Sequence, residues 1–245
     1  VERPRMGSDP PRLVLAPIDV AAPVADTLLS GTAAVLTSAT LALGGSFDPM
    51  ARTLGLTLSE DPWEGLDVGT PFDYSRQGIL YTPTHLPRPA AGISEAALDE
   101  ILALTEASGG GVLGLFSSRR AAQEAAEVLR GATDLTVYAQ GEDQLPTLVE
   151  AFTREEDSCL VGSLSLWQGV DVPGHTCRLV IIDRIPFPRP DDPVAQARIE
   201  AVTAAGGNGF MSVAATHAAL LLAQGAGRLV RRAGDRGVVA VLDPR

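Results

Sequence analysis

The chain has 245 residues, a net charge of −11 and 45% hydrophobic residues, as expected of a folded globular protein rather than a disordered one. No apolar run reaches the roughly 18 residues that a membrane span needs, and the N-terminus lacks the apolar core of a signal peptide. We therefore expect a cytoplasmic protein without membrane contact. The acidic balance argues against a freestanding nucleic-acid binder, because phosphate binding normally requires a basic surface.

The 19 basic residues are all arginine, so no P-loop lysine is present. The two cysteines, Cys159 and Cys177, have no CxxC spacing, and we expect buried free thiols in a reducing compartment. The histidines at 85, 175 and 217 are scattered, and none suggests a catalytic triad. No metal site is expected.

In chain order, AVLTSATL (34–41) predicts a strand that ends in hydroxyl residues. Proline- and glycine-rich stretches follow at 60–71 and 82–92. Ser94 then caps a helix that stops at the three glycines 109–111. These glycines precede a strand and lack the GK[ST] ending of a phosphate loop, so we assign them to a turn.

From residue 112 onward, short apolar runs alternate with helical patterns. The expected strands are 112–116, 135–140, 158–163, 178–185 and 238–243. The expected helices are 119–130 (with Ser117 and Ser118 as cap candidates and Gly131 as its stop), 146–154, one opening at Asp192, and 212 to about 232. Continuous apolar strands separated by helices predict an α/β fold with a doubly wound, mostly parallel sheet flanked by helices.

The last predicted helix carries the clearest candidate site. Gly225 and Gly227 would sit inside it, each at a cost of about 1 kcal/mol relative to alanine, which is tolerated where a ligand or backbone must approach closely. Gln224, Arg228 and Arg231 would share one helical face beside them. The alternative is a solvated arginine face at a helix end. The glycines favour an anion-binding surface.

Two further segments carry polar residues after predicted strands. LSLWQGVDVPG (164–174) follows the strand at 158–163, where parallel sheets bind ligands. Its Trp167 is either a core plug or a stacking surface, and Asp171 is either a turn residue or a functional carboxylate. The cluster at 37–40 is either a helix cap or a phosphate-contacting loop.

These segments, in this order, resemble the DinG-like helicases, relatives of the XPD group in superfamily 2. The similarity covers nearly the whole chain from about residue 13. The matching segments are VLTSATL (35–41, motif III), VLGLFSSRR (112–120, motif IV), VGSLSLWQGVDVPG (161–174, motif V), QGAGRLVR (224–231, motif VI), the stretch 178–198 and the closing LDPR (242–245).

The resemblance implies the second RecA-like lobe of an ATP-driven, 5′-to-3′ DNA helicase, with residues 109–245 forming that lobe (motifs IV–VI) and residues 1–108 a motif III-containing segment that joins the two motor lobes. Such proteins bind ATP and Mg²⁺ mainly through the N-terminal lobe of the same polypeptide. That first half carries the Walker A lysine, the acidic box and, in many members, an iron–sulfur cluster. None of these motifs occurs in this chain, so we expect it to be inactive alone. The implied partners are single-stranded or forked DNA and the N-terminal lobe.

By the same resemblance, Arg228 and Arg231 contact the ATP phosphates, one of them as an arginine finger, and Gln224 couples nucleotide state to lobe closure. Further residues are assigned by their motifs: Gly169, Asp171, Gly225 and Gly227 near the nucleotide, and Ser38, Thr40, Ser117, Ser118, Arg119 and Trp167 near DNA. Gln168 departs from the family, because many relatives have glutamate before the motif V glycine. A role that needs a charge there is in doubt.

Two other interpretations remain open. The chain could be a RecA-like binding or regulatory module without motor function, which the change at Gln168 and the acidic balance favour. It could also be an unrelated α/β nucleotide-dependent enzyme, but the sequence shows no catalytic base, nucleophile or metal cluster to support that interpretation.

Overall fold

The computed structural model describes residues 13, 15–38, 40–42, 44–59, 61–163, 166 and 176–245. The chain forms two compact units. The first combines Val1–Val68 with Pro188–Thr216, and the second combines Gly69–Phe187 with His217–Arg245. Among the described residues, none of the helices is long and apolar enough to cross a membrane. The functional division at residue 108 stays a prediction.

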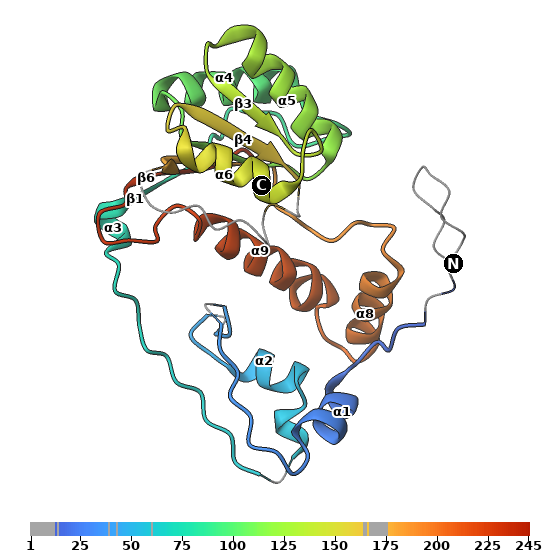
Figure 1. Cartoon of the computed structure of the whole chain (residues 1–245). Coiled ribbons are helices and arrows are strands. Elements are labelled where there is room, and N and C mark those ends of the chain that lie inside the picture. The colour runs from blue at the N-terminus through green and yellow to red at the C-terminus, as the bar shows by residue number, and fades with distance from the viewer. Residues whose placement is uncertain are drawn as a thin grey trace. The chain divides into compact units, whose positions relative to one another are not determined.

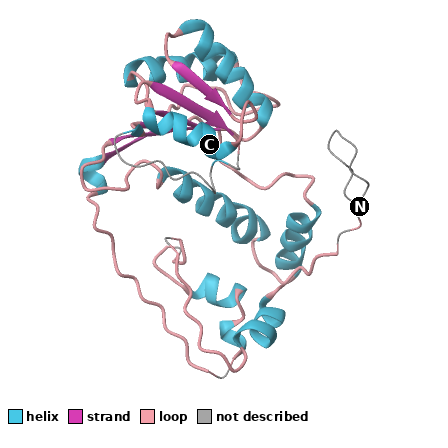
Figure 2. Ribbon diagram, viewed as in Figure 1, coloured by secondary structure: helices cyan, strands magenta, loops and turns pink. Residues whose placement is uncertain are grey.

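The second unit is built on a six-stranded sheet in the order β1-β6-β5-β2-β4-β3, drawn as magenta arrows in Figure 2. Every pair of neighbouring strands is parallel. This confirms the doubly wound α/β fold. The strands are β1 Gly78–Tyr81, β2 Val112–Leu115, β3 Thr136–Ala139, β4 Ser158–Gly162, β5 Leu179–Ile182 and β6 Gly237–Val241.

Helices cover both faces of this sheet (Figure 1). One core lies under α4 (Glu95–Ser108) and α5 (Arg119–Ala132), and the other lies under α6 (Leu145–Arg154) and α9 (Thr216–Ala226). Along β2, Val112 belongs to the first core and Leu113 to the second, because successive side chains of a strand point to opposite faces. The central strands are therefore apolar on both faces, as their sequences predict.

Helix ends follow the expected capping residues with one exception. The Ser94 hydroxyl accepts a hydrogen bond from the Ala97 amide at 3.2 Å, and α4 ends at Gly109, whose φ of 64° is left-handed. Helix α5 does not stop at Gly131 as expected. It continues to Ala132, and the Thr133 hydroxyl then donates to the Leu129 carbonyl at 2.8 Å.

One expected strand does not form in the described residues, and two elements of the second unit were not expected. Residues 34–41 form no strand in their described part, and Val35 is 90% exposed. An isolated strand without a neighbour to pair with is not stable, which accounts for the difference. In contrast, the edge strand β1 and the short helix α3 (Tyr74–Gln77) were not expected.

The first unit is helical. Its elements are α1 Ala21–Val24, the π-helix Ala25–Leu29, α2 Asp48–Thr53, the 3₁₀ helix Leu56–Leu58, α8 Pro193–Ala204 and the π-helix Phe210–Ala215. Asp192 caps α8 as expected, because its carboxylate accepts from the Val194 and Ala195 amides at 2.9 Å. The Arg198 Nε donates to the Ile18 carbonyl at 2.9 Å and so joins α8 to the segment before α1.

Two glycines of the second unit give a test of its packing. A Cβ added at Gly237 would lie 2.1 Å from the Arg178 carbonyl oxygen, whereas at Gly131 nothing lies within 4 Å. We expect Gly237→Ala to lower the free energy of unfolding by about 1–3 kcal/mol, since overpacking forces the strands apart. Gly131→Ala should leave it unchanged or raise it by up to about 1 kcal/mol. Urea denaturation checks both, and equal effects would contradict the close approach of Gly237 to the Arg178 backbone.

Candidate nucleotide and DNA contacts

The motif VI segment leaves its helix earlier than the sequence predicts. Helix α9 ends at Ala226, so Gly227 lies beyond it. The Arg228 amide then donates to the Gly225 carbonyl and the Leu229 amide to the Ala226 carbonyl, both at 3.1 Å. These shorter i→i−3 bonds tighten the chain into a turn.

The expectation that Gln224, Arg228 and Arg231 share one helical face is therefore wrong. The physical reason is that α9 ends at Ala226, just before Gly227, a residue that destabilises a helix interior. Leu229 and Val230, between the two arginines, are 2% and 6% exposed and belong to the core under α6 and α9. Gln224 and both arginines are half-buried at the surface of this turn. Gly225 lies inside the helix and is buried.

A carboxylate behind the turn fixes its backbone. Asp235 is 7% exposed, and its Oδ2 accepts from the Arg231 amide at 2.9 Å and from the Arg232 amide at 2.8 Å. Cys177 lies beside these groups. Burial raises the pKa of its thiol to about 12, with Arg231 lowering and Asp235 raising that pKa. Both cysteines are free and buried, as expected.

Gln77 is a residue of this site that the sequence did not single out. It is 7% exposed, and its Nε2 donates to the carbonyls of Arg232, Ala233 and Asp235 at 3.1–3.2 Å. A lone glutamine 155 positions before its partner gives no local signal. Gln77 directly precedes the edge strand β1, which the sequence did not predict either.

At the opposite edge of the sheet, Ser117 follows β2 and Asp183 follows β5. The Ser117 amide donates to Asp183 Oδ1 at 2.8 Å, and its hydroxyl donates to Oδ2 at 2.7 Å. Arg184 Nε also donates to Oδ2, at 3.2 Å. Burial raises the pKa of Asp183 above its usual range, although the bonds from Ser117 and the charge of Arg184 act to lower it.

Ser118 has the capping role that the sequence predicted. Its hydroxyl oxygen accepts from the Ala121 amide at 3.1 Å, and Ser118 and Arg119 are both exposed at the N-terminus of α5. The hydroxyl hydrogen of Ser118 therefore stays available to an acceptor. Because helix N-termini attract anions, these two residues form a candidate phosphate contact.

The closing LDPR segment stabilises the same edge. Asp243 is 4% exposed and accepts from the Ile185 amide at 2.9 Å and from Arg245 Nη2 at 2.7 Å. Burial raises the pKa of Asp243, but the hydrogen bonds from Arg245 and Ile185 outweigh it, so the pKa lies below its ordinary value. The Arg245 guanidinium also lies over the Phe187 ring, 5.6 Å from its centroid.

The remaining predicted site residues belong to motifs V and III. Trp167, Gln168, Gly169 and Asp171 of motif V lie outside the described residues. Ser38 and Thr40 of motif III belong to the first unit, where the Thr40 amide donates to the Ser38 hydroxyl at 3.2 Å. Their predicted roles near nucleotide and DNA stay predictions.

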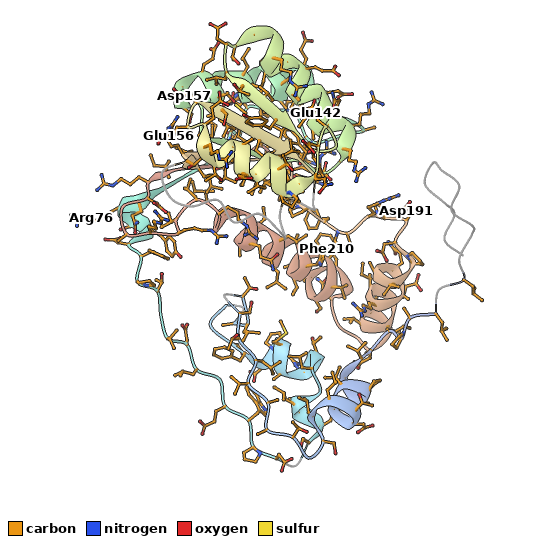
Figure 3. All side chains as sticks on the ribbon, in the orientation of Figure 1. Arg76, Glu142, Glu156, Asp157, Asp191 and Phe210 are labelled. Atoms are coloured by element: carbon orange, nitrogen blue, oxygen red, sulfur yellow. The ribbon has the colours of Figure 1, made fainter. Side chains whose placement is uncertain are left out.

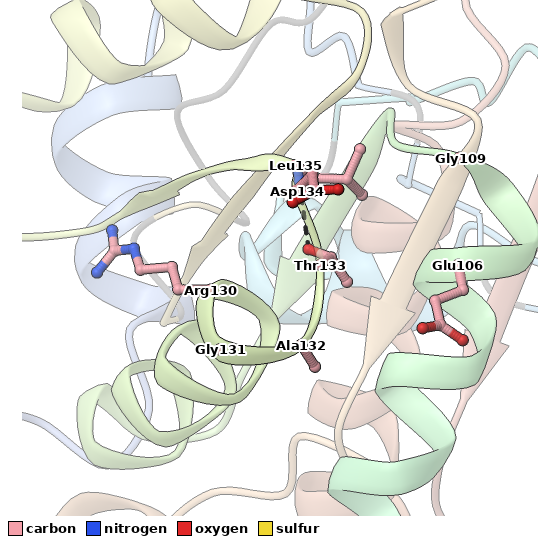
Figure 4. Close-up of a pocket in the computed structure, with 8 residues that line it drawn as sticks. All are labelled: Glu106, Gly109, Arg130, Gly131, Ala132, Thr133, Asp134 and Leu135. Atoms are coloured by element: carbon pink, nitrogen blue, oxygen red, sulfur yellow. Dashed lines mark hydrogen bonds between the residues drawn. The ribbon is translucent and has the colours of Figure 1, made fainter.

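Acidic, histidine and cysteine side chains do not gather into a metal centre in the part of the chain that the structure describes. No group of three or more of these described residues could hold a metal ion. Figure 4 shows an open, polar depression between the end of α5 and the start of β3. Its Arg130 already bonds Glu142 at 2.7 Å, so we assign it no function.

Comparison with known proteins decides the family. The helicase C-terminal domain family matches residues 101–245, which is more than half of the chain. The chain belongs to this family. It is 58% identical over 235 residues to the ATP-dependent helicase DinG of Mycobacterium tuberculosis, covering 95% of this chain and 35% of that protein. It is 38% identical to the ATP-dependent DNA helicase YoaA of Haemophilus influenzae, covering 86% of this chain and 32% of that protein.

The chain therefore spans about a third of the length of these curated relatives. A solved structure named XPD helicase has a TM-score of 0.52 at 20% identity and covers 69% of this chain and 32% of that one. This likeness confirms that the fold is RecA-like.

The Ser117–Asp183 pair allows a direct titration test. Ser117→Ala should raise the pKa of Asp183 further, because it removes a hydrogen bond that favours the charged form. Because the folded-state pKa of Asp183 lies above the unfolded value of about 3.9, the protonated carboxyl stabilises the fold at low pH. This contribution is lost as pH rises from about 3.9 through the folded-state pKa. Carbon-13 NMR of the carboxyl carbon measures the change. Ser118→Ala is the control and should leave this pKa unchanged, and a fall in Ser117→Ala would refute the assigned bond.

Proposed function

We propose that this chain is the C-terminal motor lobe of an ATP-dependent DNA helicase that moves 5′ to 3′. The observation that carries the proposal is the motif VI turn, where Arg228 and Arg231 flank a buried apolar pair in a chain of the helicase C-terminal domain family. The similar proteins DinG and YoaA are named as ATP-dependent helicases. The complete motor then includes an N-terminal RecA-like lobe of the same polypeptide.

The chemistry of the turn suits phosphoryl transfer. A guanidinium stays charged at all physiological pH values and presents several donors to phosphate oxygens. When bound, ATP with Mg²⁺ supplies the transferable phosphoryl group, held mainly by the N-terminal lobe. This chain contributes Arg228 and Arg231, one of them as the arginine finger that stabilises charge in the transition state. Gln224, at the end of α9, couples the turn to lobe closure.

The second contact is with DNA at the edge where the strands end. Asp183 accepts the Ser117 hydroxyl hydrogen, so Ser117 positions the loop rather than donating to phosphate. Ser118 and Arg119, at the N-terminus of α5, make the phosphate contact instead. Single-stranded or forked DNA is the proposed partner.

Single substitutions in the complete protein test the finger. Arg228→Ala or Arg231→Ala should lower kcat for ATP by about 10³-fold or more with little change in KM, because the contact forms in the transition state. Arg236→Ala is the matched control, since Arg236 is exposed on the same connection to β6, and it should keep kcat. The isolated 245-residue chain should show no DNA-stimulated turnover. Unchanged hydrolysis in both arginine variants, or turnover by the isolated chain, would refute the proposed division of labour.

Salt dependence tests the DNA contact. Arg119→Ala should weaken binding of single-stranded DNA and reduce the slope of log affinity against log salt by about one, because one phosphate contact is lost. The control is Arg120→Ala on the same helical turn, whose Nε already donates to Glu124 at 2.7 Å and which should change the slope less. Fluorescence anisotropy at several salt concentrations gives both slopes, and an unchanged slope for Arg119→Ala would rule the contact out.

A further inference from the structure

Gln77 connects two segments of the second unit that are far apart in the sequence. It ends the short helix α3, on which Figure 3 labels the neighbouring Arg76. Its Oε1 accepts from the Asp73 amide at 2.8 Å, which orients the side-chain amide. Its Nε2 then faces the connection between Arg231 and β6, where it donates to three carbonyls.

The chemistry of glutamine matches this place closely. The amide group has an acceptor and a donor on one plane, so one end can be fixed by Asp73 while the other holds the connection. The carbonyls of Arg232, Ala233 and Asp235 share the Gln77 amide nitrogen as their donor, and the bond to Asp235 is buried, where an unpaired carbonyl would be unfavourable. Glutamate has the same shape but would place an acceptor against them.

Asp235 and Gln77 hold complementary groups of the same connection. The Asp235 carboxylate accepts from the amides of Arg231 and Arg232, and the Gln77 amide donates to carbonyls from Arg232 onward. The backbone is thus fixed through its donors at Arg231 and Arg232 and through its acceptors from Arg232 onward. A turn fixed on both sides presents its arginines in one geometry before any ligand arrives.

We propose that Gln77 is a positioning residue for the motif VI arginines. It does not touch the nucleotide. It fixes the connection that follows the turn from the end of α3, so that Arg228 and Arg231 meet the transferring phosphoryl group in a productive position. The inference rests on the proposed role of these arginines.

The test uses the complete helicase with Gln77→Met, which removes the donor at similar size, and Gln77→Glu, which replaces it with an acceptor. We expect kcat to fall about 10–100-fold, more for Glu than for Met, with KM within about twofold, because misplacement affects the transition state. Affinity for ADP with aluminium fluoride should fall while affinity for ADP alone is kept. Tyr81→Phe is the matched control: it removes a 2.6 Å bond to Glu100 from β1, the strand that directly follows Gln77, and should leave kcat unchanged.

A double variant separates positioning from general loss of structure. Gln77→Met added to Arg231→Ala should lower kcat by much less than it does in the unmodified protein, since the residue acts through the arginine turn. The inference would be overturned if the kcat of the double variant fell by the full product of the two single losses. It would also be overturned if the Gln77 variants folded and kept normal kcat. If Arg228→Ala and Arg231→Ala themselves keep normal kcat, the proposed function fails first, and this outcome is distinct.

Discussion

Leu229 and Val230 are buried between two half-buried arginines, and this burial determines how the motif VI turn can act. Each such side chain stabilises the fold by about 1.5–3 kcal/mol when buried, more than the roughly 1 kcal/mol of a typical hydrogen bond. The apolar pair therefore sets how deep the turn sits. The hydrogen bonds that Asp235 accepts and Gln77 donates then fix the chain that follows the turn.

The parallel register separates the two candidate contacts. Val112 pairs with Leu179, which pairs with Val238, so β2, β5 and β6 start at one level. The motif VI turn precedes β6 and lies at the edge where these strands start. Ser117 and Ser118 follow β2 and lie at the edge where they end. A sheet packed on both faces moves as a rigid body, which suits the proposed lobe, with nucleotide contacts at one edge and DNA contacts at the other.

The sequence predicted β2, β4 and β5 because each is a continuous apolar run, which only a sheet covered on both faces can bury. It missed β1, whose Ile79 and Leu80 are 65% and 70% exposed and give no such pattern. It overextended α9, since the glycine and arginine spacing looks helical where the chain turns after Ala226. It identified the motif residues from their order. No local sequence pattern could single out Gln77, because its hydrogen-bond partners lie more than 150 positions away.

The acidic balance of the chain is compatible with a DNA contact if that contact is local. Several arginines on the lobe are already paired with glutamate, as in Arg120–Glu124 and Arg130–Glu142, so they contribute little to a long-range positive field. Salt screening further limits the range over which exposed charges interact to about 8–10 Å at physiological salt. Attraction to phosphate then depends on oriented donors at one point, the exposed N-terminus of α5. The proposed DNA contact therefore depends on geometry at that one point rather than on the overall charge of the lobe.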